Sequence, residues 1–261
     1  MVDVLELLLL GSFAGFTIFL GLPVVLLGIS DRTRGFLSAF AVGILMFLIV
    51  DVFSHAWDLT TASAQDAFQG NGPTGTAVAD LVLMFGGITL GLLGLVAYER
   101  SYMGKGHESV EPSKVSTMTA LGIGAHNLSE GLAIGQSFAF GAVPLGIVLV
   151  VGFAAHNTTE GFGITAPFVG MGQKPKTPFL AKVLFIGGVP TLVGTLLGAA
   201  WYSPEAYVFF LSLAGGALVY VTMLMFNTGR RRFSSGLMMG GIFLGLCLGF
   251  ITDLIVSLGG A

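Results

Sequence analysis

The chain has 261 residues, of which 54% are hydrophobic and only 10% are charged, and its mean hydropathy is +0.90. A soluble domain carries about a quarter charged residues, because its surface must face water. The composition therefore excludes an ordinary soluble protein and favours one that is solvated by the lipid bilayer. The formal net charge of −3 leaves no basic surface for a polyanion, so we expect no nucleic-acid partner.

The predicted helices follow from runs of apolar residues. The N-terminal run carries Asp3 and Glu6 and lacks the positive region of a secretory signal, so we interpret it as the start of a retained helix. A membrane-spanning helix needs roughly 20 mostly apolar residues. Eight stretches qualify, approximately at residues 5–29, 36–57, 79–98, 116–140, 143–170, 180–201, 207–226 and 236–258. The sequence thus predicts an all-α membrane protein with eight transmembrane helices in a single domain, 1–261.

The segments between these stretches are polar or rich in helix-breaking residues, and we expect loops there, including the Gly/Thr/Ala-rich segment 58–78. All 11 Lys and Arg residues lie in or beside alternate loops, after the first, third, fifth and seventh stretches. Basic residues stay on the cytoplasmic side of a membrane. We therefore expect a multi-pass protein of the plasma (cytoplasmic) membrane with both termini outside.

Two polar motifs interrupt the apolar pattern. The fourth stretch contains HNLSEG at residues 126–131, and the fifth contains HNTTEG at residues 156–161. Charged and imidazole groups inside a bilayer are costly and mark functional sites by default. Residues four apart share a helix face, so His126 and Glu130 can contact the same ligand, and so can His156 and Glu160. Both motifs lie near the middle of their helices, the depth at which transporters hold their substrates.

A short turn joins the two helices, so they must run antiparallel. His126 should then lie level with Glu160, and Glu130 level with His156. Two carboxylates neutralise one divalent cation, and nitrogen and oxygen ligands without thiolates suit zinc, iron(II), manganese or cadmium. The single cysteine, Cys247, lies in an apolar run and offers no thiolate cluster. The alternative is two structural His–Glu hydrogen bonds, which would not need the motif twice.

The second stretch carries Asp51 and His55 one turn apart, in its outer half. An entrance pathway for metal ions would place such groups there. The alternative is an amphipathic helix end that meets lipid headgroups, with Trp57 as its interfacial anchor. That alternative explains Asp51 poorly. His107 lies between the third and fourth stretches, in a segment expected to be a cytoplasmic loop, and we interpret it as a solvated side chain.

The segment 126–138, HNLSEGLAIGQSF, closely resembles the fourth helix of the ZIP zinc/iron transporters, and HNTTEG resembles their fifth-helix motif. The resemblance, to prokaryotic-type members, covers the whole eight-helix plan. It implies uptake of divalent metal, most of all zinc, toward the cytoplasm. It also implies an elevator-like mechanism, in which the first, fourth, fifth and sixth helices slide against the other four.

Carried over by position, the resemblance implies that His126, Glu130, His156 and Glu160 are primary metal ligands. Asn127 and Asn157 would belong to a neighbouring second site, with the two glutamates bridging. The chain departs from the family pattern in three places, one of which is the lack of the acidic residue often found late in the seventh helix, where residues 221–229 read VTMLMFNTG. Thr159 stands where a proline usually precedes the second glutamate, and Val189 stands before Pro190 where binuclear members carry a glutamate. These departures lead us to expect one tightly held metal.

Two other functions remain open at this stage. An intramembrane zinc-dependent hydrolase would also place His and Glu inside a bundle, but it needs an open coordination position and a spare general base. A metal-gated channel or a metal sensor would bind the ion at the same residues without a transport cycle. We expect a transporter that is not an enzyme and has no organic cofactor. Its partners would be divalent metal ions and the lipid bilayer, and a homodimer is left open.

Overall fold

The computed structural model describes residues 3–23, 30–103, 111–171, 173–201 and 203–258, and for residues 156, 169–171 and 255–256 it describes the backbone alone. Within these ranges the chain forms helices joined by short turns, without any strand. In chain order the elements are α1 (Val4–Phe16), the 3₁₀ helix η1 (Thr17–Gly21), α3 (Asp31–Phe68), α4 (Thr74–Met103), α5 (Pro112–Ala139), α6 (Val143–Met171), α7 (Thr177–Ala200), α8 (Pro204–Arg230) and α9 (Ser235–Leu258).

Seven segments of the described chain are long and apolar enough to cross a membrane, which confirms the expected all-α membrane class. They are the α1–η1 segment and the helices α3, α4, α6, α7, α8 and α9. The helix α5 is just as long but carries more polar side chains. Most of its residues are buried, and it packs against α6, α7 and α8. Its lower hydropathy therefore fits a helix whose neighbours are mainly protein.

The first predicted helix, 5–29, is not one continuous α-helix. The α-helical part ends at Phe16 and the chain continues as a 3₁₀ helix to Gly21, while residues 24–29 lie outside the described part. Where α1 passes into η1, the Thr17 hydroxyl donates a hydrogen bond of 2.7 Å to the Ala14 carbonyl oxygen. Beyond it, Gly21 lies directly against the backbone of Gly161 in α6, where a Cβ would not fit.

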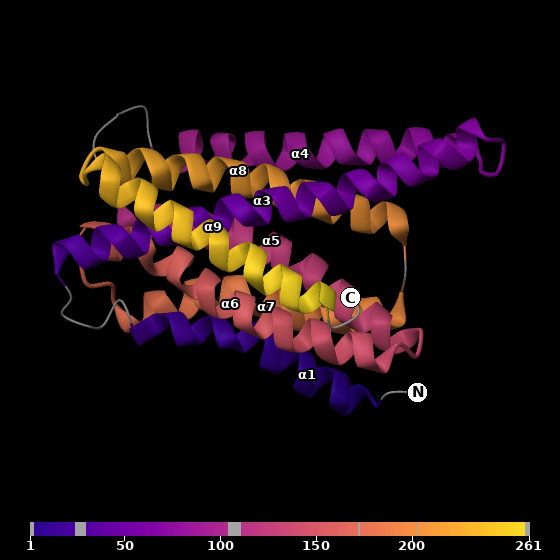
Figure 1. The fold of residues 1–261 in the computed structure, drawn as a ribbon, viewed down its shortest axis with the longest axis horizontal. Helices are drawn as coiled ribbons and strands as arrows, with labels where there is room; N and C mark the ends of the chain where they lie inside the picture. The colour runs from indigo at the N-terminus through magenta and orange to yellow at the C-terminus, as the bar shows by residue number, and fades with distance from the viewer. Residues whose placement is uncertain (1–2, 24–29, 104–110, 172, 202, 259–261) are drawn as a thin grey trace.

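The predicted loop at 58–78 is wrong. The helix α3 continues to Phe68 and α4 starts at Thr74, so only residues 69–73 form a turn, in which Gly70 has a φ of +75°. Residues 59–68 are polar enough to resemble a loop, yet they contain neither Gly nor Pro. The 38 residues of α3 span about 57 Å at 1.5 Å per residue. This exceeds a hydrocarbon core of about 30 Å, and the α3–α4 hairpin projects beyond the other helices (Figure 1).

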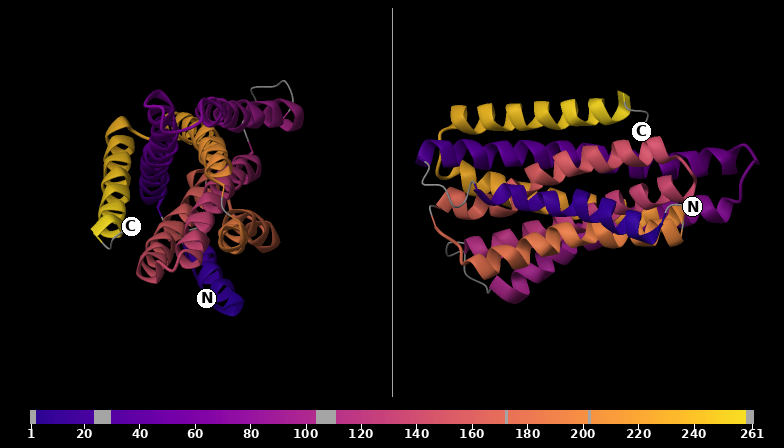
Figure 2. Two further views of the ribbon diagram at one scale, coloured as in Figure 1. Left: turned by 90° about the vertical axis from the view of Figure 1, so that its right-hand side faces the viewer. Right: turned by 90° about the horizontal axis from the view of Figure 1, so that it is seen from below.

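The helices group into two packed units, which the end-on view in Figure 2 shows one above the other. The site unit comprises α1, η1, α5, α6 and α7, and its most extensive contact is between α5 and α7. The flanking unit comprises α3, α4, α8 and α9, and its main contacts are α4 with α8 and α3 with α9. The two units meet mainly where α5 faces α8 and where α3 faces α6.

Glycines bring helices together within each unit. In the site unit, a Cβ on Gly194 or Gly198 of α7 would overlap the backbone carbonyl of Leu128 or Leu132 in α5. In the flanking unit, Gly91 and Gly245 make equally close backbone approaches to α8 and α3. Such small-residue contacts let helices pack closely where the surrounding lipid provides no hydrophobic driving force.

The interface between the units is looser. A Cβ on Gly122 of α5 would lie 3.5 Å from the Ala217 Cβ and 3.6 Å from the nearest Val221 methyl group in α8, which are ordinary van der Waals distances. Among the described glycines, each one whose added Cβ would come within 3.0 Å of another helix meets a helix of its own unit. The tightest backbone contacts therefore hold each unit together and do not bind one unit to the other.

We predict that Gly198→Ala destabilises the protein by about 1–3 kcal/mol, the usual cost of overpacking. The added methyl group would force α7 away from the Leu132 carbonyl. The matched control is Gly94→Ala in α4, where a Cβ meets nothing within 4 Å. Because alanine favours a helix over glycine, the control should be neutral or slightly stabilising. Thermal unfolding of the two purified variants in detergent tests this, and equal transition temperatures would contradict it.

The two ends of the bundle differ in charge. The start of α3 and the α8–α9 turn lie at one end, together with Arg32 and the run Arg230–Arg232. The marked chain termini lie toward the opposite end (Figures 1 and 2). This separation of the basic turns from the termini is the arrangement on which the proposed membrane orientation depends.

Candidate metal site

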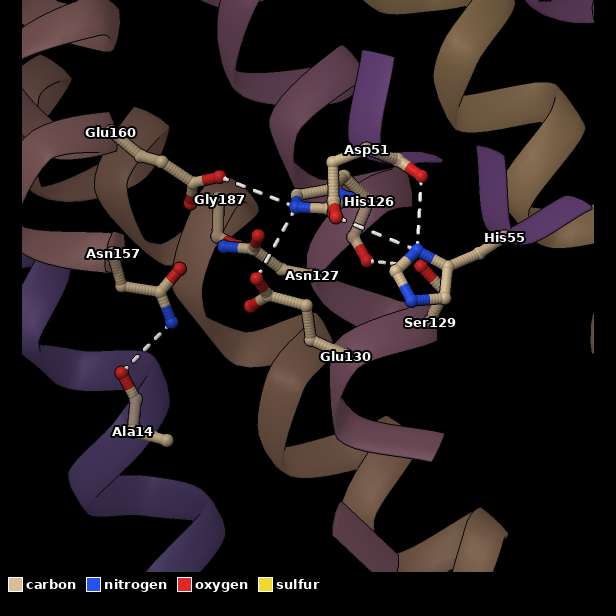
Figure 3. Close-up of polar contacts among 10 residues, drawn as sticks. All are labelled: Ala14, Asp51, His55, His126, Asn127, Ser129, Glu130, Asn157, Glu160 and Gly187. Atoms are coloured by element: carbon tan, nitrogen blue, oxygen red, sulfur yellow. Dashed lines mark hydrogen bonds and ion pairs between the residues drawn. The ribbon is translucent and has the colours of Figure 1, made fainter. Parts of the chain in front are cut away.

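The two polar motifs lie on the facing helices α5 and α6. His126 and Glu130 are one turn apart on α5, which begins with Pro112 at its first position and has no proline inside. The Ser129 hydroxyl donates a hydrogen bond of 2.6 Å to the His126 carbonyl oxygen. Glu160 projects from α6 toward α5 (Figure 3). His156 also belongs to α6, but its side chain lies outside the described part of the structure.

His126, Glu130 and Glu160 form one buried cluster. The His126 Nε2 atom lies 3.2 Å from Glu130 Oε1 and 3.9 Å from Glu160 Oε1, between the two carboxylates (Figure 3). The residues are only 3%, 5% and 1% exposed, respectively. The structure thus brings together three of the four residues expected as primary ligands, including the expected level pair His126 and Glu160.

Asn127 and Asn157 lie beside this cluster, and each ties its helix to another helix of the site unit. The Asn127 amide donates a hydrogen bond of 3.0 Å to the Gly187 carbonyl oxygen in α7, and the Asn157 amide donates one of 2.9 Å to the Ala14 carbonyl oxygen in α1. Both asparagines are fully buried. With the nitrogen atoms engaged in this way, the orientation of both side-chain amides is fixed.

Several buried oxygen atoms at the site accept no hydrogen bond from the described residues: Glu130 Oε2, Asn127 Oδ1 and Asn157 Oδ1. Buried acceptors without donors are rare and call for an explanation, such as an ion. A cation would satisfy carboxylate and amide oxygens together. The donor set, with imidazole nitrogen and hard oxygen atoms, suits zinc and the neighbouring divalent transition metals.

The described side chains do not by themselves form a finished metal centre, since no group of three or more His, Cys, Asp or Glu has the arrangement of one. Two ligand atoms of a tetrahedral zinc lie about 3.3 Å apart, given bonds of 2.0–2.1 Å. The His126–Glu130 spacing of 3.2 Å suits a shared ion, whereas the His126–Glu160 spacing of 3.9 Å is a few tenths of an ångström too long. Closing around an ion would therefore require Glu160 and His126 to approach each other by a few tenths of an ångström, through side-chain rotation or a small movement of α6.

A cavity of about 450 Å³ leads from His126 and Glu130 toward the end of the bundle that holds the termini. Asp51 and His55 of α3 line it. The His55 Nδ1 atom lies 2.9 Å from the Asp51 carbonyl oxygen and 3.5 Å from its carboxylate Oδ1 (Figure 3). His126 and Glu130 form part of the cavity lining, while Glu160 is absent from it and lies deeper.

The cavity has polar lining residues that sequence reasoning did not assign to the site. Asp253, Thr252 and Ser257 line it from α9, and Gln136 and Ser137 line it from α5. From the sequence, Asp253 is one of the acidic residues expected on the outer side of the membrane, but it has no assigned place beside Asp51. Its distance of about 200 residues along the chain from Asp51 hid the relation, because the packing of α9 on α3 creates it.

Val189 does not face the site. It lines an apolar groove of about 370 Å³ on α7 together with Leu121, Leu128 and Pro190. The face of α7 that reaches the cluster carries the Gly187 carbonyl, which accepts from Asn127, and Thr191, which follows one turn later. The position before Pro190 is therefore not equivalent in space to a ligand position, and the expected comparison of Val189 with a metal-binding glutamate is wrong.

Comparison with known protein families agrees with the geometry. The family model described as the ZIP zinc transporter matches residues 97–252, which is more than half of the chain and includes the whole cluster on α5 and α6. Asp51, His55 and Asp253 lie outside the matched range. A search of curated proteins found no significant match. On the strength of the family match, and of the apolar helices and buried cluster described above, this chain is a member of the ZIP family of zinc transporters.

Proposed function

We propose that the protein carries zinc across the plasma membrane into the cytoplasm, with the whole chain acting as one transport domain. The observation that supports this most directly is the buried cluster of His126, Glu130 and Glu160 at the inner end of the 450 Å³ cavity. Two carboxylates in a bilayer need a compensating charge, and one divalent cation provides it. Family membership makes a divalent metal the substrate class.

The proposed primary ligands are His126, Glu130, His156 and Glu160, with Asn127 and Asn157 contributing at a neighbouring weaker position. Asp51 and His55 would receive the ion in the cavity before it reaches the cluster. Iron(II), manganese and cadmium share the ligand preference for nitrogen and oxygen, and we propose them as competing substrates. We propose zinc as the main substrate because it accepts four such ligands in a tetrahedral site.

The proposed orientation has eight crossings with both termini outside. The seven apolar segments give an odd number, and α5, with 28 residues, would be the eighth crossing. Its polar motif would be tolerated because α6, α7 and α8 pack around it. The basic residues at the start of α3 and in the α8–α9 turn would then face the cytoplasm, in accord with the positive-inside rule.

We propose alternating access between two positions of the site unit. The cavity beside the cluster has a volume of about 450 Å³ and lies toward the outer end, whereas the pocket between the units at the inner end holds only about 20 Å³. Val115, Met225 and Phe233 are among the residues that line this small pocket. The loose contact at Gly122 and the tight glycine contacts inside each unit support a movement of one unit as a body against the other.

The direction of transport is tested with the purified protein in liposomes. Gly75→Cys, exposed in the first turn of α4, should react with an impermeant maleimide on the side from which zinc enters. Arg231→Cys, exposed in the α8–α9 turn, should react on the side where zinc is released. Zinc accumulation is read from a dye inside the liposomes in the fraction of known orientation. Accumulation from the Arg231 side alone would contradict uptake.

We predict one tightly bound zinc ion per chain. One ion with Glu130 and Glu160 gives a formal charge of zero, and a second ion about 4 Å away would add about 4 kcal/mol of repulsion even at the dielectric constant of water. The nearby groups on α7 are the Gly187 carbonyl and Thr191, which bring no negative charge. Calorimetry and elemental analysis of the purified protein check this, and two ions of equal affinity would contradict the charge argument.

A further inference from the structure

An open cavity of about 840 Å³ lies between the first turns of α3 and α9, at the basic end of the bundle. Arg32 of α3 and Arg232 of the α8–α9 turn both line it, together with the hydroxyl-bearing residues Thr33 and Ser234. The cavity is remote from the metal cluster, and none of its lining residues is shared with the 450 Å³ cavity.

The two arginines of this cavity differ from their neighbour Arg34. Arg34 forms an ion pair of 3.1 Å with Asp31. No carboxylate of the described residues lies within 4 Å of the guanidinium nitrogens of Arg32 or Arg232, and both residues are exposed. Two guanidinium groups without a carboxylate partner among the described residues, one from α3 and one from the α8–α9 turn, thus line one cavity, and arginine binds phosphate oxygens through its planar fork of donors.

The rest of the cavity is apolar. Phe36, Phe233, Leu237 and Gly240 line it, and Leu237 and Gly240 lie progressively further along α9 from its basic end. A Cβ on Gly240 would meet nothing within 4 Å, so there is room for a ligand along the helix. A free phosphate ion would fill only the charged part. A ligand with an anionic head and a hydrocarbon tail would fill both parts.

We propose that this cavity binds one anionic phospholipid, with its phosphate held by Arg32 and Arg232 and an acyl chain lying along Leu237 and Gly240. The end of the bundle supports the choice of a lipid, because basic pockets between transmembrane helices on the cytoplasmic side bind lipid head groups. This choice of ligand rests on the proposed orientation, which places this end of the bundle at the cytoplasmic leaflet. It does not depend on zinc transport, so a binding measurement can fail without affecting the proposed function.

The test is native mass spectrometry of the purified full-length protein, titrated with phosphatidylglycerol and, separately, with phosphatidylcholine. Wild type should bind one phosphatidylglycerol at least about tenfold more tightly than phosphatidylcholine. Arg32→Gln and Arg232→Gln should each weaken phosphatidylglycerol binding about fivefold, the usual contribution of one basic residue near an anionic lipid. Arg232→Lys, which keeps the charge, should retain most of the binding.

Two sets of control variants test the charged and the apolar part of the cavity separately. Arg230→Gln and Arg231→Gln change the same basic run but not the cavity lining, and they should leave binding within twofold. Gly240→Leu should weaken lipid binding by filling the apolar part, whereas Gly94→Leu, at a similarly open position on α4, should not. Equal losses in the lining and control variants would overturn the proposal. So would displacement of the lipid by millimolar inorganic phosphate combined with indifference to Gly240→Leu, which would indicate a site for a free anion.

Discussion

Alanine in place of His126, Glu130 or Glu160 is expected to lower zinc uptake by about 100-fold, at an unchanged amount of protein in the membrane. Each change removes one member of a cluster in which every side chain is at most 5% exposed. Breaking a buried charge cluster costs several kcal/mol, because the remaining charge is left uncompensated, and 2.8 kcal/mol corresponds to about a factor of 100. Uptake of radioactive zinc into cells and binding by the purified variants measure the two parts of the effect.

The pattern among variants separates ligation from folding. His156→Ala is expected to behave like the other three, although its side chain lies outside the described part. His107→Ala removes a histidine of the loop between α4 and α5, outside the described residues, and should leave uptake unchanged. Monodisperse, correctly inserted variants that bind no zinc would support the site. Near-normal uptake by two of the four cluster variants would show that the ion takes another path.

The pairing of α5 with α6 could be predicted from the sequence because its causes are local. A repeated His-x-x-x-Glu spacing fixes the face of each helix, and a turn of a few residues fixes their antiparallel order. The helices α6 and α7 were likewise predicted within a few residues, since apolar runs end there at turns that contain glycine, proline or lysine. In these cases short-range chemistry and the three-dimensional structure agree.

Other features depended on packing between distant segments. Hydropathy predicted a helix end near residue 57, but α3 continues to Phe68 because a helix does not need apolar residues once it leaves the membrane. The side of α7 that faces the metal cluster could not be read from its sequence. The position of Pro190 suggested that Val189 stands where a ligand would be. Instead, Gly194 and Gly198 pack closely on α5, and in this orientation of α7 the Val189 side chain lines an apolar groove. Asp253 joins the cavity only through the packing of α9 on α3.

A disulfide between the two units is expected to stop zinc uptake reversibly. With cysteines at positions 122 and 217, the Cβ atoms would be about 3.5 Å apart, within the range of 3.5–4.5 Å that a disulfide requires. The bond would join α5 of the site unit to α8 of the flanking unit at their loose contact. If the site unit must move for zinc to pass, the oxidised double variant should transport at most about a tenth as fast as its reduced form. The reason is that the disulfide holds α5 to α8 and prevents the two helices from sliding past each other.

The experiment begins with Cys247→Ser, so that the introduced thiols are the only ones in the chain. Gly122→Cys/Ala217→Cys is reconstituted, oxidised and assayed before and after dithiothreitol, with each single cysteine variant treated in parallel. The control is Gly11→Cys/Thr195→Cys, which joins α1 to α7 within the site unit; the Cβ atoms would lie 3.0 Å apart, so the two helices must separate by a few tenths of an ångström for the bond to form.

The control disulfide should leave uptake unchanged, because both of its ends would move together. Zinc binding by the oxidised Gly122–Ala217 variant should also persist, since the cavity already reaches His126 and Glu130 in this arrangement of the units. Binding without transport, restored to transport by reduction, is the signature of two units that must slide past each other. Full uptake by fully cross-linked protein would instead mean that zinc passes through α5 and α6 with the α5–α8 contact intact, as in a channel.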